Sequence, residues 1–546
     1  MTTIYLRVNL LIVFLSLVFL LGCTRTKKHV LVPENYRNYI AWFNGLDNEL
    51  YPQHIPNDSA WDFLKGNIPL LDCPDSVIEQ TYYYRWWTYR KHIRHTDDGF
   101  VLTEFLPEMG HAGEHNTIAC ALGHHIREGR WLHNKRIVDD YIYFWYHGGK
   151  ESKPPDHLFH YSNWLNHAVW ERYLVTGRKD FIIKQLPVMI RTFERWEKNH
   201  RTKEDLFWSY DVRDGMEESI SGSRTEKNRR ATISSYMYGQ AMAISNIAEL
   251  AGKEGLAKKY KNKADTIKKA INEKLWDSYE KFYKVMFEDG SLSGARELHG
   301  YVPWYFNIPP EKHSPAWKQV LDPEGFYAPY GPTTAEQRHL EFSLKKAYES
   351  DKACRWDGPG WPYATSQTLT SMANLLNHYD QQIIDNNDYF RQLKIYSKSH
   401  KLETDTGTVP WIDESLNPYT GEWITRYRFE ENNYNGWGTG GERGKPERGK
   451  AYNHSTYCDL IINGLIGIRP EEGDVVTVNP LIPEGTWDWF CLDRIPYHGG
   501  ELTILWDKTG EKYGKGRGFH VYFDGREVFS AGRIDSVRIE LPQNSE

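Results

Sequence analysis

Cysteine is scarce in this chain of 546 residues, and its six cysteines lie far apart in the sequence. No Cys-x-x-Cys pair occurs, so the sequence predicts neither a disulfide framework nor a zinc ribbon. An excess of positive charge is also missing, because the formal net charge is −6. A nucleic-acid partner is therefore not expected, since proteins that bind nucleic acid carry a basic surface.

The clearest targeting signal lies at the N-terminus. Residues 8–22, "VNLLIVFLSLVFLLG", form an apolar run that follows Arg7 and ends at Cys23. The run has the length of a signal-peptide core and is short for a membrane span, which takes about 20 residues. The ending "LLGC" resembles a bacterial lipobox. This implies a signal peptide over 1–22, a lipid on Cys23, and export to the periplasmic or cell-surface face of a bacterial membrane. An uncleaved N-terminal anchor is the alternative.

Tryptophan and tyrosine are abundant, with 21 Trp and 36 Tyr. Flat apolar rings with a polar rim are typical of proteins that stack against sugars. A large aromatic core is the alternative explanation, and it accounts for most of these residues in any case.

A helical pattern begins at about residue 115. Apolar residues recur at i, i+3, i+4 and i+7, as at Ala241, Ile244 and Ala248. The pattern predicts helix pairs over 116–147, 166–200, 235–276 and 366–400, with breaks at "TGRKD" and "GKEG", and a further helix from residue 455. Helix pairs joined by long loops predict a mainly α toroid, in which the loops at one end form a site.

The pattern changes after Pro470. Segments such as "GELTILWDK" and "GFHVYFDGREVFSAG" alternate apolar and polar residues and contain turn signals. We therefore predict a small antiparallel β-domain over 471–546. The remaining boundaries follow: a signal peptide at 1–22, a tether at 23–36, an N-terminal segment at 37–110 and a helical barrel at 111–470.

Two acidic loops and a tryptophan loop carry the candidate chemistry. "RDGMEESISGSR" (213–224) contains Asp214, Glu217 and Glu218. "WIDESLNPYTGEWI" (411–424) contains Glu414 beside Trp411, and "CRWDGPGWPYATSQTL" (354–369) lies between the two acidic loops. Enzymes that cleave glycosidic bonds need two carboxyl groups, one to donate a proton and one to activate water or attack directly. Taken alone, the first acidic stretch is more typical of a solvated surface, and Glu414 of a structural residue.

The three loops, in this order, resemble those of the (α/α)6-barrel inverting glycoside hydrolases of the trehalase, processing α-glucosidase and mannosylglycerate hydrolase group. "GMEES" corresponds to that group's acid loop, "WDGPGW" to its tryptophan loop and "ESLNPYTGE" to its base loop. The last match is the most specific, since Glu414, Asn417, Pro418, Thr420 and Gly421 all fall in place. The resemblance covers about residues 80–470 and implies a toroid of six helical hairpins.

The resemblance implies an exo-acting hydrolase that inverts the anomeric centre of a glycosidic bond, most often an α-linked one. Its general acid falls on Glu217 and its general base on Glu414. The relatives usually have Asp at the acid position, so Asp214 and Glu218 stay open as alternative donors. Asp357 occupies a position where processing glucosidases often carry Arg, although Arg355 lies two positions earlier. This departure bears on the identity of the sugar more than on the type of reaction.

The remaining site residues are assigned to substrate binding. Trp356, Trp361, Trp411 and Trp437 are candidates for sugar stacking, and Arg355 and Asp357 for contacts with the sugar's polar groups. His111 is expected either at the mouth of the barrel or as a hydrogen-bonded structural histidine. The substrate is expected to be an oligosaccharide or polysaccharide, and neither a metal nor an organic cofactor is required.

Three other classes compete with this interpretation. "HAGEH" (111–115) matches the H-x-x-E-H pattern of some zinc peptidases, but Gly113 weakens the helix that such a site needs. A polysaccharide lyase on the same toroid would use Tyr or His as its base. A non-catalytic glycan-binding lipoprotein would keep the tryptophans and would not need both acids. The glycine-rich stretch 432–450, which holds Trp437, is expected to be a flap over the substrate or a plain surface loop.

Overall fold

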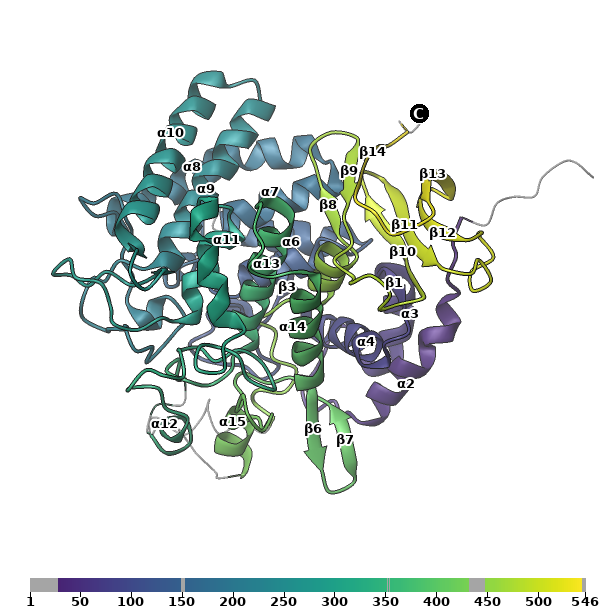
Figure 1. The fold of residues 1–546 in the computed structure, drawn as a ribbon, viewed down its shortest axis with the longest axis horizontal. Helices are drawn as coiled ribbons and strands as arrows, with labels where there is room; N and C mark the ends of the chain where they lie inside the picture. The colour runs from purple at the N-terminus through teal and green to yellow at the C-terminus, as the bar shows by residue number, and fades with distance from the viewer. Residues whose placement is uncertain (1–27, 149–152, 351, 353, 432–446, 543–546) are drawn as a thin grey trace, which may run out of the picture.

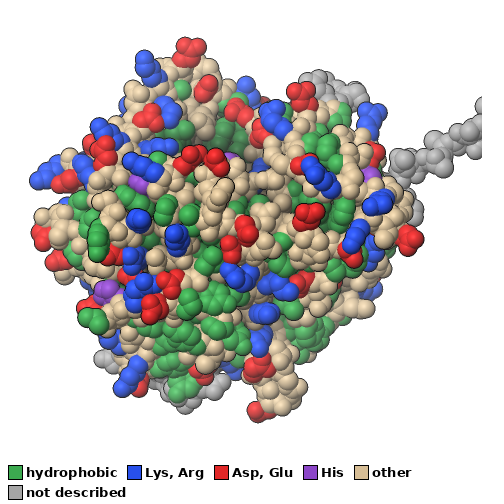
Figure 2. Space-filling model, in the orientation of Figure 1, with side chains coloured by type: hydrophobic (Ala, Val, Ile, Leu, Met, Phe, Trp, Pro, Cys, Tyr) green, Lys and Arg blue, Asp and Glu red, His purple; other side chains and the backbone are tan. Residues whose placement is uncertain are grey.

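The computed structural model describes residues 28–148, 153–350, 352, 354–431 and 447–542. They form a helical body with a β-domain on one side (Figure 1). Positive and negative side chains are intermixed over the face shown in Figure 2, in keeping with the near-balanced charge. Within the described residues, no helix combines the length and the apolar character needed to cross a bilayer.

The helices lie mainly between residues 37 and 399. Their bounds are α2 Arg37–Gly45, α3 Asn57–Asn67, α4 Ser76–Lys91, α5 Leu122–Gly129, α6 Lys135–His147, α7 Leu165–Thr176, α8 Lys179–His200, α9 Ala231–Leu250, α10 Glu254–Ala270, α11 Val302–Tyr305, α12 Lys345–Glu349, α13 Pro362–His378, α14 Asn386–Ser399 and α15 Ile424–Arg426. A π-helix, η10 Leu460–Leu465, follows near the end of the helical body.

The predicted helix pairs are present, and in two of them a glycine ends the first helix. Gly177 has φ +66 and its N–H bonds to the carbonyl of Tyr173, which ends α7 before α8 begins. Gly252, with φ +69, follows α9 in the same way. A left-handed residue after a helix satisfies the last carbonyls, and glycine adopts it without steric cost. The breaks at "TGRKD" and "GKEG" are therefore confirmed.

Helix α4 was not anticipated from the sequence. Its buried residues run without interruption from Thr81 to Lys91, so they lie on every side of the helix. A helix without a polar face has no amphipathic period, and pattern analysis cannot detect it. It packs against α2, α3 and α14.

The helices follow one another around a ring. Helix α5 packs on α7, α7 on α9, α9 on α11, and α11 on α13. Arg127 of α5 and Arg130, the residue that follows α5, bond to the buried carboxylate of Asp459 at the start of η10, and η10 packs on α13. The chain is thus a helical toroid followed by a sheet domain, whereas the count of six hairpins stays a prediction.

The C-terminal part is antiparallel, as predicted. Its strands are β8 Ile468–Pro470, β9 Val475–Val478, β10 Trp489–Tyr497, β11 Gly500–Asp507, β12 Gly518–Phe523, β13 Arg526–Ala531 and β14 Val537–Glu540. One sheet has the order β14-β9-β8. The other has the order β1-β10-β11-β12-β13, in which β1 is Leu70–Asp72. Strand β1 comes from the N-terminal segment and pairs with β10, from Leu70 opposite Asp493 to Asp72 opposite Cys491. The sequence had not indicated this pairing.

Three small hairpins complete the fold, and Figure 1 shows one of them, β6 with β7, at the lower end of the molecule. The hairpins are β2 Ile93–Thr96 with β3 Gly99–Leu102, β4 Trp276–Asp277 with β5 Phe282–Tyr283, and β6 Lys401–Thr404 with β7 Gly407–Pro410. Helices α12 and α15 lie together at the lower end in Figure 1, away from the β-domain. They flank the tryptophan loop and the second acidic loop, so these loops lie at one end of the ring.

Candidate active site

Glu217 lies on the loop that joins α8 to α9, and its side chain is partly exposed. Burial raises the pKa of Glu217 from 4.5 to about 8, and the nearby negative charges of Glu414 and Asp211 act in the same direction. A carboxyl group with this pKa holds its proton at neutral pH. Glu217 therefore has the protonation state that a general acid needs.

Asp214, three residues earlier, is fully buried and surrounded by partners. It forms an ion pair with Nε of Arg230 at 2.9 Å and accepts hydrogen bonds from the hydroxyls of Ser162 and Thr232. These groups satisfy its negative charge within the protein. The side chain thus ties α9 to the loop and does not face solvent.

Glu218 points to two cations instead. It lies 3.0 Å from Arg224 and 2.8 Å from Lys352. Burial would raise its pKa, but hydrogen bonds and charge from Lys352 and Arg224 outweigh that effect and leave the pKa below its usual value. A carboxyl in this state is ionised at neutral pH and is a poor proton donor.

The three loops are joined by backbone hydrogen bonds. The N–H of Trp356 donates to the carbonyl of Glu217 at 3.0 Å. Gly360 and Leu416 exchange a pair of bonds at 2.9 and 3.0 Å. The tryptophan loop therefore lies between the two acidic loops and is bonded to both. It fixes their spacing without any contact between their acidic side chains.

Glu414 lies on the second acidic loop, and only 5% of it is exposed. Its Oε2 forms an ion pair with Arg448 at 2.6 Å, and the thiol of Cys354 lies 3.6 Å from its Oε1. A charge-assisted bond to a guanidinium offsets the cost of burying a carboxylate. Glu414 is thus held as an ion pair, whereas Glu217 has no such cation against it in the described residues.

The tryptophan loop holds a pair of indole rings that are almost fully buried, Trp356 at 3% and Trp361 at 4% exposure. Trp356 and Trp361 stack with ring centres 4.7 Å apart, and the Trp361 indole donates to the carbonyl of Arg355 at 2.8 Å. Arg355 pairs with Asp357, its Nε lying 3.1 Å from the carboxylate. The pair neutralises the Asp357 charge, so the departure noted in the sequence is compensated within the loop.

Trp411 lies on the second acidic loop, close to Asp413 and two cations. Its indole N–H donates to Asp413 at 3.5 Å. The charged groups of Arg426 and Lys450 lie 5.0 and 5.4 Å from its ring centre. Cations over an indole ring stabilise its position.

A third carboxyl group, Glu104, belongs to the same cluster and was missed from the sequence. Its Oε1 accepts a bond from the hydroxyl of Tyr452 at 2.6 Å, and its Oε2 has no partner among the described residues. Burial raises the pKa of Glu104 to about 8, with further increases from the charges of Glu414 and Glu217. The site thus contains three carboxyl groups, and the negative charge of one raises the pKa of another.

Arg448 and Tyr452 were also missed. Arg448 lies at the end of the glycine-rich stretch and Tyr452 just after it, whereas Glu104 lies more than three hundred residues earlier in "EFLPEMG". Burial of the Arg448 charge is compensated by Glu414, and its guanidinium lies 5.0 Å from the centre of the Phe105 ring. The nearest sequence signal was His111, seven residues after Glu104, which was expected at the mouth of the barrel.

His111 lies exposed near this cluster, with its ring 5.6 Å from that of Phe105. The zinc-peptidase alternative requires His111 and His115 on one helix. Residues 111–113 are turns instead, and His115 has φ +62. His115 contacts Asp98 at 2.8 Å. The zinc-peptidase helix is therefore absent from this described segment.

Two predicted site residues lie outside the described residues, as do the predicted signal peptide and most of the glycine-rich stretch. The two residues are Cys23, the predicted lipidation site, and Trp437, the predicted stacking residue in the glycine-rich stretch.

Two family models match the chain. The first, described as "Mannosylglycerate hydrolase MGH1-like glycoside hydrolase domain", matches residues 114–455. The second, "Glycosyl hydrolase family 65, C-terminal domain", matches residues 468–529. The first match covers Glu217, the tryptophan loop and Glu414 together.

Solved structures show the same fold. One named "Sialidase" is 42% identical, with a TM-score of 0.87 over 95% of this chain and 46% of that chain. A family GH78 rhamnosidase of Bacillus sp. GL1 is 12% identical, with a TM-score of 0.51 over 80% of this chain and 40% of its own. An α-L-rhamnosidase from Dictyoglumus thermophilum is 14% identical, with a TM-score of 0.50 over 87% and 49%. The chain thus spans less than half the length of each, and the two rhamnosidases inform the fold alone.

Proposed function

Because the chain belongs to the mannosylglycerate hydrolase MGH1-like glycoside hydrolase domains, we propose that it is an exo-acting glycosidase that inverts an α-linked bond of an oligosaccharide. The family match supports hydrolysis of a glycosidic bond. Inversion, exo action and the linkage are the proposal. The proposed architecture is an (α/α)6 toroid over 111–470 with a β-domain over 471–546.

The observation that carries the proposal is the contrast between two carboxyl groups on loops that are both bonded to the tryptophan loop. Burial raises the pKa of Glu217 to about 8, whereas Glu414 is ion-paired with Arg448. Two carboxyl groups in opposite environments are what acid–base hydrolysis requires, because one must hold a proton while the other accepts one.

In the proposed mechanism, Glu217 transfers its proton to the glycosidic oxygen as the bond to the anomeric carbon breaks. Glu414 accepts a proton from a water molecule that attacks that carbon from the opposite face. The product sugar has inverted configuration, and the two carboxyl groups have exchanged protonation states. Inverting pairs lie about 6.5–9.5 Å apart, which leaves room for the water.

Glu217 is proposed as the donor over its two neighbours. The partners of Asp214 hold it inside the protein, and the cations around Glu218 favour its charged form. The stacked Trp356 and Trp361 are proposed to contact the sugar ring. The other proposed substrate contacts are Arg355, Asp357, Trp411, Trp437 and His111.

A hydrolysis assay with anomer analysis tests the proposal. The purified full chain is incubated with α- and β-aryl glycosides of common hexoses and deoxyhexoses, and the first-formed anomer is followed by NMR. We expect an α-glycoside to release its β-anomer before mutarotation. Release of the α-anomer first would exclude inversion.

The same assay separates the alternatives. Cleavage of aryl sialosides would favour the activity in the name of the 42% identical structure, of which this chain matches 46%. An unsaturated product absorbing in the ultraviolet would indicate a lyase. Binding without any product would favour the glycan-binding alternative.

We also propose that the protein is an exported lipoprotein, supported by the run before Cys23. Metabolic labelling with an alkyne fatty acid in a bacterial host should mark the wild type and not Cys23→Ala. Equal labelling of both would exclude Cys23 as the lipidated residue.

A further inference from the structure

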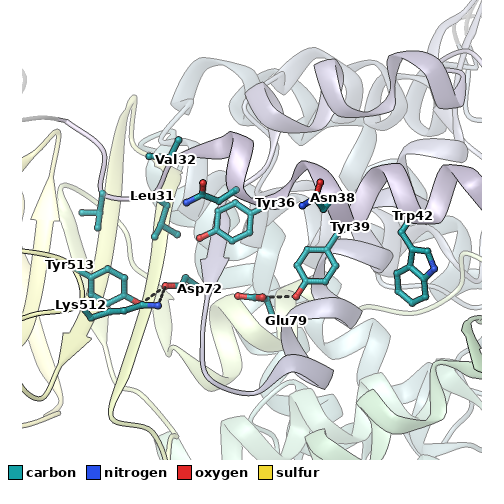
Figure 3. Close-up of a pocket in the computed structure, with 12 residues that line it drawn as sticks. Leu31, Val32, Tyr36, Asn38, Tyr39, Trp42, Asp72, Glu79, Lys512 and Tyr513 are labelled. Atoms are coloured by element: carbon teal, nitrogen blue, oxygen red, sulfur yellow. Dashed lines mark hydrogen bonds and ion pairs between the residues drawn. The ribbon is translucent and has the colours of Figure 1, made fainter.

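A groove lies between the N-terminal helices and the β-domain (Figure 3), and none of the three catalytic loops lines it. Its volume is about 670 Å³, within the range of roughly 300–1,000 Å³ that small-molecule sites occupy. One wall is formed by α2 and the short 3-10 helix before it, Pro33–Tyr36. The opposite end is formed by the loop between β11 and β12.

Aromatic side chains form a row along this groove. Tyr36, Tyr39 and Trp42 follow one another at three-residue spacing, which places them on one face of the helix. Tyr83 supports two of them from behind, with ring centres 5.0 Å from Tyr36 and 5.3 Å from Tyr39. Trp42 is 40% exposed, which is unusual for an indole in a chain that buries most of its tryptophans.

Carboxylates with spare hydrogen-bonding capacity lie beside the row. Glu79 accepts bonds from the Tyr39 hydroxyl at 2.6 Å and the Cys73 N–H at 3.2 Å. A carboxylate has about four lone-pair positions, so the capacity of Glu79 is only partly used. Burial raises the pKa of Glu79 to about 7, so near neutral pH it is able to donate as well as accept.

The far end of the groove has little net charge. Asp72 accepts a bond from the Tyr513 hydroxyl at 2.9 Å, and the ammonium of Lys512 lies 3.4 Å from the same oxygen. The Lys512 charge thus offsets that of Asp72. A polyanion finds no unopposed cation here, whereas a neutral, hydroxyl-rich molecule finds both acceptors and donors.

We propose that this groove binds a neutral oligosaccharide, separately from hydrolysis, with Trp42 and Tyr39 against the pyranose faces and Glu79 and Asp72 on the hydroxyls. Flat rings with polar groups at their rim match the two apolar faces and polar edge of a pyranose. The site goes beyond the proposed function, because it holds a glycan chain without contact with Glu217 or Glu414. It gives the protein a second point of attachment to a polymeric substrate.

Calorimetric titration tests this second site. The full chain with Glu217→Gln and Glu414→Gln is used so that the probes survive, and the probes are maltohexaose, cellohexaose, a mannohexaose and xylohexaose. We expect at least one to bind, and addition of Trp42→Ala to weaken it about tenfold, the upper range for one aromatic contact. Tyr279→Ala, which removes an aromatic ring that is 89% exposed outside the groove, should leave affinity unchanged.

Failure of this site is distinguishable from failure of the proposed function. Trp42→Ala in the otherwise wild-type chain should hydrolyse small aryl glycosides at the wild-type rate. If no hexasaccharide binds, or if affinity is the same with and without Trp42, the second site does not exist. If Trp42-dependent binding persists while no glycoside is hydrolysed, the second site stands and the glycosidase proposal fails. Trp42→Phe, expected to bind with intermediate affinity, checks that the loss comes from stacking.

Discussion

At the scale of single residues, three acids within five positions have three different environments. Asp214 is buried against Arg230, Glu217 lies near other carboxyl groups, and Glu218 lies between Arg224 and Lys352. Each environment is created by residues distant in the chain or by the local turn. The chemistry of each carboxyl therefore follows from its neighbours and not from its type.

The difference between Glu217 and Glu218 predicts their mutants. Glu217→Gln should lower kcat/KM by about 10²–10⁴, because it removes the proton donor. Glu218→Gln is the matched control, and it should stay within tenfold of wild type. Kinetics with an aryl glycoside measure both. An inactive Glu218→Gln beside an active Glu217→Gln would reverse the assignment.

The raised pKa of Glu217 predicts the pH dependence of activity. The carboxyl must be protonated to act, so kcat/KM should be retained below pH 8 and fall about tenfold per pH unit above it. A pH–rate profile between pH 5 and 10 checks this. Activity that rises through pH 8 would show that Glu217 acts in its ionised form or not at all.

Glu104 predicts how stability depends on pH. Its pKa is raised from 4.5 to about 8, so between these values the folded state binds more protons than the unfolded state. Its contribution is therefore fully present below about pH 4.5 and is lost as pH rises to 8. Glu104→Gln should make the slope of unfolding free energy against pH less negative, by up to about 1.4 kcal/mol per pH unit. Denaturant unfolding at several pH values measures it, and an unchanged slope would contradict the raised pKa.

At the scale of elements, the site depends on how closely loops approach one another. Gly449, beside Arg448, is packed against the second acidic loop. A Cβ at this position would lie 1.7 Å from Oδ1 of the buried Asp413. Only glycine permits this approach, which brings Arg448 to Glu414.

Gly449→Ala should therefore displace Arg448 from Glu414 and lower kcat about 10²-fold, as expected for a misplacement of about 1 Å. Gly255→Ala is the control, since a Cβ there meets nothing within 4 Å and Gly255 lies in α10. Circular dichroism verifies the fold of both variants, and kcat measures the effect. Full activity of Gly449→Ala would mean that the loop moves without disturbing the site.

At the scale of the whole molecule, the ring of helices is closed by a buried polar network. Asp459 accepts bonds from Arg127, Arg130 and Trp131, all from the first part of the ring. The Glu128 carboxylate accepts hydrogen bonds from the backbone N–H groups of Tyr457, Cys458 and Asp459. These N–H groups precede η10 and have no partner within a helix. The start and the end of the toroid are thus held together by α5.

Asp459→Ala should lower the free energy of unfolding by about 3–5 kcal/mol, because it leaves buried guanidinium groups unpaired. Asp488→Ala is the control, since its pair with Lys508 is exposed at both ends and should contribute about 0–1 kcal/mol. Denaturant unfolding compares the two variants. Equal effects would show that the network does not close the ring.

The sequence by itself determined the helix pairs, the antiparallel C-terminal strands and the three loops that carry the family's motifs. These features rest on local periodicity and turn residues, as at Gly177, and on motif spacing, as at Glu414. Such features can be predicted because they depend on residues a few positions apart in the sequence.

Only the tertiary structure decided that α4 is a helix, that β1 joins the C-terminal sheet, and that Glu104 and Arg448 join Glu217 and Glu414. It also decided which of the three neighbouring acids is paired and which has a raised pKa. The physical reason is the same in each case. Burial and charge are set by groups that the fold brings together, from Arg224 beside Glu218 to Tyr452 beside Glu104, and the local sequence pattern does not report them.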